Sequence, residues 1–318
     1  MSASVIQTGC TALLEASRES SYWSDQLNTA DNLLHIFCNQ RNSTAQKAGD
    51  WIVTQVSTED MGAVRIATIN NPPRGYMNAE TATELCDILT AAESDPHINA
   101  LVFTGGIEDV FIRHYDVSEI VAVAKGFRGG DIKPGGDRSA SPVYRLFDHM
   151  IVTPLATVAA INGTCMGGGF EFALTCDIRI AATGDYQIGL PETRLGIIPG
   201  VGGLQLLSRV IGLSRAREMV MRGRVVGPTE ALHLGLVHEL ADGAVIDTAL
   251  AVAEEVTERP PVAVASVKRM ASEIAAGESL DQGLQTAEAE FARCLLEGNA
   301  AMEKMEAFLD DGEDITAV

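Results

Sequence analysis

The sequence predicts an α/β fold built around a largely parallel sheet. Short apolar segments with the composition of buried strands alternate with longer segments whose apolar residues recur at helical spacing. Glycine, proline and asparagine separate these segments. Because parallel neighbours in a sheet need a crossover, usually a helix, this alternation favours β-α-β units with right-handed connections. Repetition of the unit produces a spiral.

Composition and charge exclude several kinds of partner. The 318 residues are 46% hydrophobic, which is enough for a full core in one large or two unequal domains. A formal net charge of −20 opposes binding to nucleic acid or to an anionic membrane. No segment reaches the roughly 18 apolar residues of a membrane helix, and residues 1–20 lack the features of a secretory signal. We expect a cytoplasmic protein without membrane or nucleic-acid partners.

Cysteine and histidine spacing gives no sign of a metal site. The six cysteines include no Cys-x-x-Cys pair, and the histidines form no cluster at metal-ligand spacing. Reduced and mostly buried thiols are expected, with no bound metal.

The chain is expected to begin with an N-terminal extension, residues 1–51, which is partly helical. It is rich in Ser, Thr, Asn and Gln and carries an apolar patch at residues 33–37. A packing arm or loose tail explains this composition, and a contact between subunits is the alternative.

The core is expected to span residues 52–212 and to contain the active site. A strand over residues 64–69 ends at Asn70–Pro73. A helix capped by Asn78 follows, and residues 100–104 form the next buried strand. This is the first β-α-β unit.

Residues 153–203 contain the densest grouping of candidate functional residues. A strand at 157–161 leads through Gly167, Gly168 and Gly169 into a helix over 170–176, with Glu171 in its first turn. A second strand at 186–190 leads to Glu192 and a glycine-rich loop. N–H groups at a helix start are unpaired and favour negative charge. A glycine triplet also marks ordinary tight turns, so spacing alone leaves a structural role open.

Residues 126–142 contain glycines, charges and Pro134. They are expected to form either a mobile loop that covers a cleft or simply an exposed insertion. Residues 213–318 are expected to be mainly helical, with a break at Arg259–Pro261. The apolar stripes of these helices indicate core or subunit contacts.

Several ordered motifs resemble the signature of the crotonase (enoyl-CoA hydratase/isomerase) superfamily, over roughly residues 52–318. They are Asn162-Gly163, Gly167-Gly168-Gly169-Phe170-Glu171, Cys176-Asp177-Ile178-Arg179-Ile180-Ala181, Pro191-Glu192 and Leu195 to Gly203. The resemblance implies a spiral of β-β-α units with a C-terminal helical trimerisation region, and a homotrimer or homohexamer.

The resemblance also implies chemistry on an acyl-CoA. In this family two backbone N–H groups stabilise a thioester enolate, and here they belong to Tyr115 and Gly168. Hydratases of the family use two glutamates, at the positions of Glu171 and Glu192. Phe111 and Asp116 fit the family pattern Phe-x-x-Gly-x-Asp, but His114 replaces its glycine and Tyr115 replaces a small residue.

The paired glutamates favour an enoyl-CoA hydratase that needs no cofactor besides its coenzyme A thioester substrate. An isomerase, a hydratase-lyase, an acyl-CoA hydrolase and a noncatalytic scaffold are the alternatives. The departure at Arg113, His114 and Tyr115 and the N-terminal extension support the scaffold. Further substrate contacts are expected from a few residues near the site. They are Arg113, His114, Asp116, Gly167 and Gly200, with Arg74 and Lys125 as further candidates for the coenzyme A phosphates.

Overall fold

The computed structural model describes residues 54–310. They belong to two compact units, one with residues 54–119 and 141–310 and the other with residues 120–140. The predicted N-terminal extension, residues 1–51, lies outside the described residues. So do residues 311–318.

The larger unit contains a six-stranded sheet within its described residues. Its strands, in spatial order, are β1 (Val56–Met61), β2 (Val64–Ile69), β3 (Ala100–Gly105), β5 (Ala156–Ile161), β7 (Ile178–Ala182) and β10 (Glu239–Ala241). Only β1 is antiparallel to its neighbour, and the other pairs are parallel. The sequence prediction of a largely parallel sheet is confirmed.

A second, smaller sheet carries the segments that matter for function. Its order is β4 (Val110–Ile112), β6 (Thr164–Met166), β8 (Ile188–Gly189) and β9 (Val225–Val226). The first three strands are parallel, and β9 is antiparallel to β8. Successive pairs β3/β4, β5/β6 and β7/β8 each give one strand to either sheet, so the chain winds as the predicted spiral of β-β-α units.

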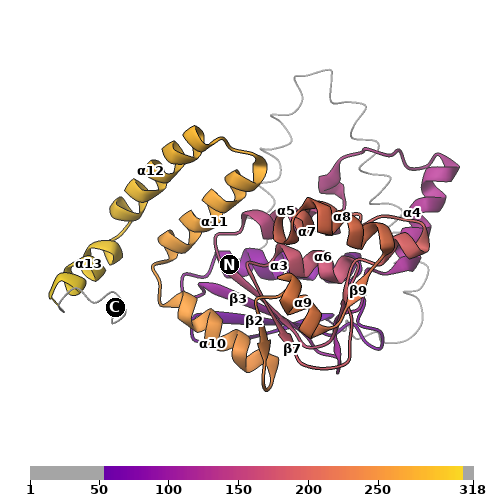
Figure 1. Ribbon diagram of the computed structural model, residues 1–318, viewed down its shortest axis with the longest axis horizontal. Coiled ribbons are helices and arrows are strands. Elements are labelled where there is room, and N and C mark those ends of the chain that lie inside the picture. Colours follow the sequence, from indigo (N-terminus) through magenta and orange to yellow (C-terminus); the bar gives the residue numbers. More distant parts are fainter. Residues whose placement is uncertain (1–53, 311–318) are drawn as a thin grey trace, which may run out of the picture. The chain divides into compact units, whose positions relative to one another are not determined.

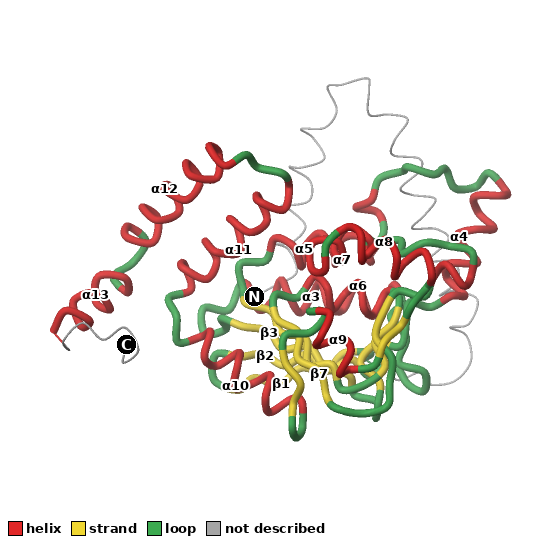
Figure 2. The backbone as a smooth tube through the Cα atoms, in the orientation of Figure 1, coloured by secondary structure: helices red, strands yellow, loops and turns green. Residues whose placement is uncertain are grey.

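Helices cover both faces of the large sheet (Figures 1 and 2). On one side lie α3 (Ala79–Glu93), α5 (Pro142–Val152), α6 (Gly168–Thr175) and α7 (Gly203–Ile211), and on the other lies α10 (Val245–Thr257). Strand alternation divides the core accordingly: Ala67 and Phe103 face the first group of helices, and Ile66 and Val102 face α10. Full burial of an aliphatic or aromatic side chain contributes about 1.5–3 kcal/mol.

Helix α3 begins as its sequence predicts. Asn78 is its N-cap, and the Asn78 side-chain oxygen accepts a hydrogen bond from the Thr81 N–H at 2.8 Å. A cap of this kind satisfies one of the N–H groups that the first turn leaves without a partner.

The smaller unit's described part contains most of α4 (Val117–Gly129) and the 3-10 turn η1 (Arg138–Ala140). The predicted loop over 126–142 therefore starts inside a helix and contains one helical turn. Pro142 lies at the first position of α5, where proline fits because its missing N–H would be unpaired.

Helices dominate the chain after the spiral. Besides α10, they are α8 (Leu213–Arg222), α9 (Pro228–Leu234), α11 (Pro261–Ala276), α12 (Leu280–Leu296) and α13 (Ala300–Asp310). The mainly helical character predicted for this region is observed across its described residues.

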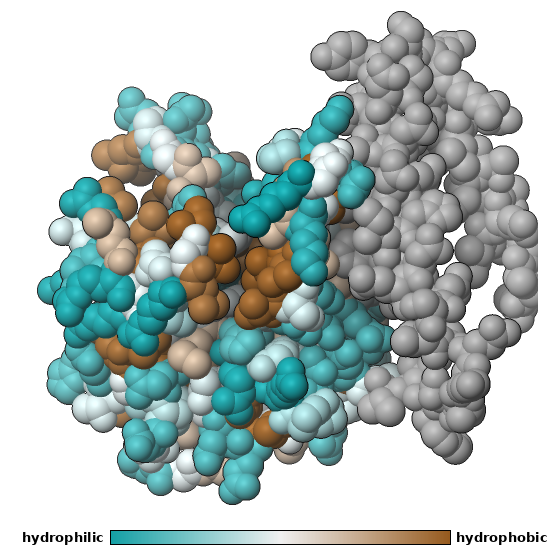
Figure 3. Space-filling model, turned by 90° about the vertical axis from the view of Figure 1, so that its right-hand side faces the viewer, coloured by the Kyte–Doolittle hydropathy of each residue, from teal (hydrophilic) through white to brown (hydrophobic). Residues whose placement is uncertain are grey.

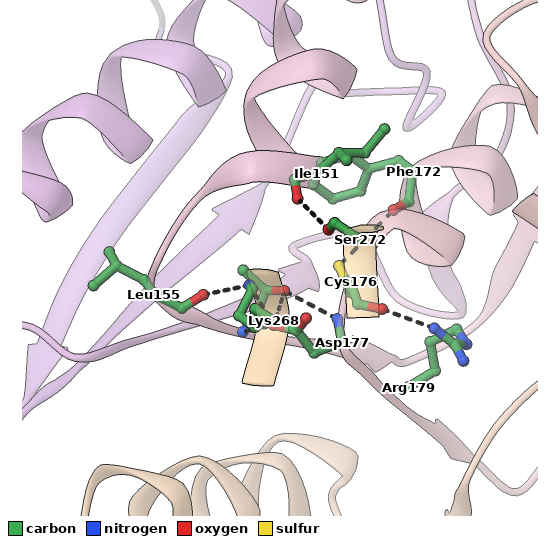
Figure 4. Close-up of polar contacts among 9 residues, drawn as sticks. Ile151, Leu155, Phe172, Cys176, Asp177, Arg179, Lys268 and Ser272 are labelled. Carbon is green, nitrogen blue, oxygen red and sulfur yellow. Dashed lines mark hydrogen bonds and ion pairs between the residues drawn. The ribbon is translucent and has the colours of Figure 1, made fainter. Parts of the chain in front are cut away.

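Lys268 links α11 to the spiral through hydrogen bonds (Figure 4). Its Nζ donates to the Leu155 carbonyl and to Asp177 Oδ2, both at 2.6 Å. The same Asp177 oxygen accepts from the Thr157 N–H and hydroxyl, both at 2.8 Å. Ser272, one turn further along α11, donates to the Ile151 carbonyl at 3.5 Å. One carboxylate therefore joins β5, the start of β7 and α11.

Replacement of Lys268 by methionine is expected to lower the free energy of unfolding by about 1.5 kcal/mol, the lower end for hydrogen bonds to a charged group. The side chain of Asp177 is 34% exposed, so water partly compensates for the lost partner. Urea unfolding of the variant measures this, with Lys304→Met on α13 as the matched control. Equal stability of Lys268→Met and wild type would contradict the anchoring role.

Helices α12 and α13 contain no buried residue in this chain alone. Their large exposed apolar residues are Leu280, Leu284, Phe291, Leu296, Met302, Met305 and Leu309. On the face of the molecule shown in Figure 3, polar surface is interrupted by several apolar patches. None of the described helices has the length and apolar content needed to cross a membrane.

Candidate active site

Three parallel strands of the small sheet deliver the predicted site residues to one edge. Residues 113–116 follow β4, residues 167–171 follow β6, and residues 190–192 follow β8. Carboxyl ends of neighbouring parallel strands meet at the same edge of a sheet, which is where open α/β sheets bind ligands. Segments about 80 residues apart in the sequence are thereby brought together.

The glycine triplet exists because the start of α6 packs directly on the segment after β4. A Cβ on Gly168 would lie 2.9 Å from Tyr115 Cβ and 3.4 Å from the Tyr115 nitrogen, and one on Gly169 would lie 2.2 Å from the Ile112 carbonyl oxygen. Gly167 has φ +53°, a region that favours glycine. The close approach places the main chains of Gly168 and Tyr115 side by side.

Main-chain hydrogen bonds set the direction of the Tyr115 N–H. Met77 pairs with Tyr115 in a parallel bridge, in which the Met77 N–H donates to the His114 carbonyl at 3.0 Å and the Asp116 N–H donates to the Met77 carbonyl at 2.7 Å. The Tyr115 N–H therefore points away from Met77. Within the described chain, neither this N–H nor that of Gly168, at the first turn of α6, donates a hydrogen bond.

Glu171 is buried in the first turn of α6, with 3% of its surface exposed. Its Oε1 accepts from the Val201 N–H at 3.0 Å and from the Gly203 N–H at 2.8 Å. Gly203 is the first residue of α7, so a second helix N-terminus faces this carboxylate. Burial raises the pKa of Glu171 to about 7, the charge of Glu192 adds to the rise, and the N–H donors oppose it.

Glu192 opens the 3-10 turn η2 (Glu192–Leu195), three residues after β8. Its Oε1 lies 3.2 Å from the position that a Cβ on Gly167 would occupy, which places the carboxylate at the start of α6. Its Oε2 is buried and has no hydrogen-bond partner among the described residues. Burial raises the pKa of Glu192 to about 7. A buried carboxylate oxygen without a partner is costly unless something binds there.

The structure brings His114 to the site and fixes its ring. The His114 Cβ lies 3.6 Å from the Cβ position of Gly167, and its ring stacks on Tyr76 with centroids 4.2 Å apart. Nδ1 lies 2.7 Å from the Tyr115 carbonyl oxygen. Because a carbonyl only accepts, Nδ1 carries the proton in this contact and Nε2 is left for another partner.

The other predicted contact residues have structural bonds of their own. Asp116 Oδ1 accepts from the Ser118 N–H at 2.8 Å and from its hydroxyl at 2.7 Å, which caps the start of α4. Arg113 Nε donates to the Arg74 carbonyl at 2.9 Å. The Arg74 guanidinium lies 5.7 Å from the centroid of the Tyr76 ring.

The Gly200 carbonyl accepts from the Tyr144 hydroxyl at 3.2 Å, and its backbone also faces Glu171. Lys125 belongs to the smaller unit, and its place relative to the site is not defined. Among residues 54–310, no three His, Cys, Asp or Glu side chains group as a metal site requires.

Sequence reasoning missed the residues that hold the site together. They are Met77, whose main chain forms hydrogen bonds with His114 and Asp116, and Val201 and Gly203, whose N–H groups donate to Glu171. The only sequence signal for the last two was the glycine-rich loop before α7, because main-chain donors leave no side-chain pattern.

The spiral of β-β-α units and the edge of the small sheet define a crotonase-fold protein. A model of the enoyl-CoA hydratase/isomerase family matches residues 59–313. The short-chain-enoyl-CoA hydratase of Clostridium acetobutylicum is 32% identical over 216 residues, covering 67% of this chain and 78% of that protein. The chain therefore belongs to the enoyl-CoA hydratase/isomerase family and is an enzyme of that type.

Other relatives agree with this assignment. The fatty acid oxidation complex subunit alpha of Shewanella putrefaciens is 35% identical over 167 residues, which are 52% of this chain and 22% of that longer protein. The crystal structure of enoyl-CoA hydratase from Bacillus anthracis superposes with a TM-score of 0.72 at 28% identity, covering 81% of this chain and 96% of that one. The structure of DspI from Pseudomonas aeruginosa superposes with a TM-score of 0.70 at 28% sequence identity, covering 84% of this chain and 98% of that one.

Proposed function

We propose that this enzyme adds water across the double bond of a 2-enoyl-CoA. The observation that carries the proposal is the meeting of the buried carboxylate of Glu171 and the partly buried carboxylate of Glu192 with the N–H groups of Tyr115 and Gly168, which have no partner among the described residues. The N–H pair suits the thioester oxygen, where negative charge develops as the enolate forms. The carboxylates suit the two proton transfers that hydration needs.

In this mechanism Glu171 acts as the base and Glu192 as the acid. Ionised Glu171 accepts a proton from water as the water oxygen bonds to Cβ, and the electron pair of the double bond moves toward the thioester oxygen. Protonated Glu192 then gives its proton to Cα as the enolate collapses. One proton enters on Glu171 and another leaves from Glu192, and a proton shift between the two carboxylates restores the starting state.

Loss of the absorbance of the conjugated thioester, measured with crotonyl-CoA and longer 2-enoyl-CoAs, tests the proposal. The relatives named as hydratases make this the reaction to try first. Turnover to the 3-hydroxyacyl-CoA is expected. No turnover at any chain length would overturn hydration, and release of free coenzyme A or movement of the double bond would replace it with hydrolysis or isomerisation.

The pH dependence of the reaction is expected to be bell-shaped with its maximum near neutral pH. Burial raises the pKa of Glu171 and of Glu192 to about 7, and a proton shared between them titrates in two steps that belong to the pair. Below the first step both are protonated and no base remains. Above the second both are ionised and no acid remains. Measurement of kcat between about pH 5 and pH 9 checks this, and a flat profile would contradict it.

Several finer expectations stay predictions. The exposed apolar residues of α12 and α13 support a homotrimer or homohexamer formed through these helices. An acyl-CoA substrate with no further cofactor, and a cytoplasmic location, belong to the same proposal. A noncatalytic scaffold predicts that acetyl-CoA does not bind, and calorimetry distinguishes it from an enzyme.

A further inference from the structure

The side chain of Tyr115 is directed toward the first turns of two helices. Its hydroxyl donates to Glu119 Oε2 at 2.5 Å, and the ring packs against the apolar core. Glu119 lies in the first turn of α4. This bond is the distinctive consequence of a tyrosine where a small residue is the expectation, because a small side chain has no atom that reaches Glu119.

Glu119 also holds the start of α3. Its two carboxylate oxygens lie 3.2 and 3.4 Å from the Ala79 nitrogen and accept its N–H, which has no partner within the helix. One half-buried carboxylate therefore joins α3, α4 and the segment after β4. Burial raises the pKa of Tyr115, and the neighbouring Glu119 charge raises it further, so the phenol stays protonated and remains a donor.

The main chain of the segment after β4 is also bonded to the residues that precede α3. Met77, two residues before α3, pairs with both peptides that flank Tyr115. The segment thus rests on the start of α3 through main-chain bonds at Met77 and through the side-chain bond to Glu119. The main-chain bonds orient the two peptide groups beside Tyr115, and the side-chain bond is a second attachment of this segment to the start of α3.

We propose that Glu119 is a positioning residue for the oxyanion hole, acting through the Tyr115 hydroxyl to hold the Tyr115 N–H beside that of Gly168. The inference rests on the proposed thioester chemistry. It assigns the unusual tyrosine a role in aiming a backbone donor. Loss of the bond is expected to reduce kcat on the order of tenfold, as for a hydrogen bond to a charged group, because Met77 still clamps the peptide.

The test uses a chromophoric thioester, 4-(dimethylamino)cinnamoyl-CoA, whose absorption shifts to longer wavelength when donors polarise its carbonyl. Wild type is expected to shift the bound absorption. Tyr115→Phe and Glu119→Ala are expected to reduce this shift and to lower kcat for crotonyl-CoA more than they change KM. Glu119→Gln, whose amide oxygen still accepts from the phenol, is expected to retain most of the shift.

Tyr186→Phe is the matched control. Its hydroxyl donates to the Ala182 carbonyl at 2.6 Å and to the Ile161 carbonyl at 3.3 Å, and neither acceptor belongs to the segment after β4. This variant therefore loses hydroxyl bonds without removing a contact of the Tyr115 segment. An unchanged shift in folded Tyr115→Phe, or a shift lost equally in Tyr186→Phe, would overturn the inference, and so would no shift in wild type. Should Glu119→Ala not fold, Tyr115→Phe decides. A shift without hydration would instead refute the proposed reaction alone.

Discussion

Replacement of Glu192 by glutamine is expected to lower kcat for crotonyl-CoA hydration by about 10²- to 10⁴-fold, the usual contribution of a positioned acid or base. The substitution preserves shape and removes the proton that Cα must receive. Because Glu192 Oε2 has no partner among the described residues, the substitution breaks no hydrogen bond of this oxygen. The loss is therefore expected in kcat, with folding unaffected.

Glu171→Gln is expected to cause a loss of the same order. Its amide oxygen still accepts the N–H groups of Val201 and Gly203, so the loop before α7 keeps its place while the base is removed. Glu230→Gln, which weakens an exposed ion pair with Arg224, is the control and is expected to retain full activity. If either Glu171→Gln or Glu192→Gln turned over at the wild-type rate, the two-carboxylate mechanism would be wrong.

Addition of one methyl group at Gly168 is expected to lower kcat by about 10²- to 10³-fold, the usual effect of disabling one oxyanion donor. The new Cβ would lie 2.9 Å from Tyr115 Cβ, so the two main chains must separate. The distance between the two N–H groups then increases. Steady-state kinetics of Gly168→Ala with crotonyl-CoA measures the effect.

Gly243→Ala is the matched control for this change. Gly243 precedes α10, and its added Cβ would meet no atom within 4 Å. Wild-type kinetics are expected from Gly243→Ala. Wild-type kinetics from Gly168→Ala as well would show that the close approach of Gly168 and Tyr115 does not serve catalysis.

The elements predicted well from the sequence have strong local signals. The strand over Val64–Ile69 has its predicted bounds, and the helix that follows has its predicted cap, Asn78. Helix α11 begins at Pro261, the last residue of the predicted Arg259–Pro261 break. In each case periodicity, a cap or a breaker determines the element without help from distant residues.

The missed elements depend on long-range contacts. Strands β4 and β6 have three residues each, too few for a periodic pattern, and form only by pairing with each other and with β8. Helix α5 begins at Pro142, the residue at which the sequence indicated the end of a loop. Strand β10 (Glu239–Ala241) also has only three residues and forms by pairing with β7.

The sequence predicted the side chains of the candidate site but not the hydrogen bonds that position them. Glu171 and Glu192 were identified through their motifs, and the structure places both at the start of α6. The bond from Tyr115 to Glu119 was not predicted, because the sequence showed only an unexpected tyrosine. Which atom a side chain reaches depends on packing between elements, and neither composition nor spacing encodes it directly.

The most direct test of the central claim is the fate of solvent oxygen during incubation with crotonyl-CoA in ¹⁸O-labelled water. Mass spectrometry of the thioester and of its acyl fragment then locates the label. Hydration by Glu171 and Glu192 predicts an intact thioester with one labelled oxygen on the β-carbon. Incorporation of this label is expected to be lost in both Glu171→Gln and Glu192→Gln. Label found only in a released carboxylic acid, or an unlabelled acyl chain, would contradict the account.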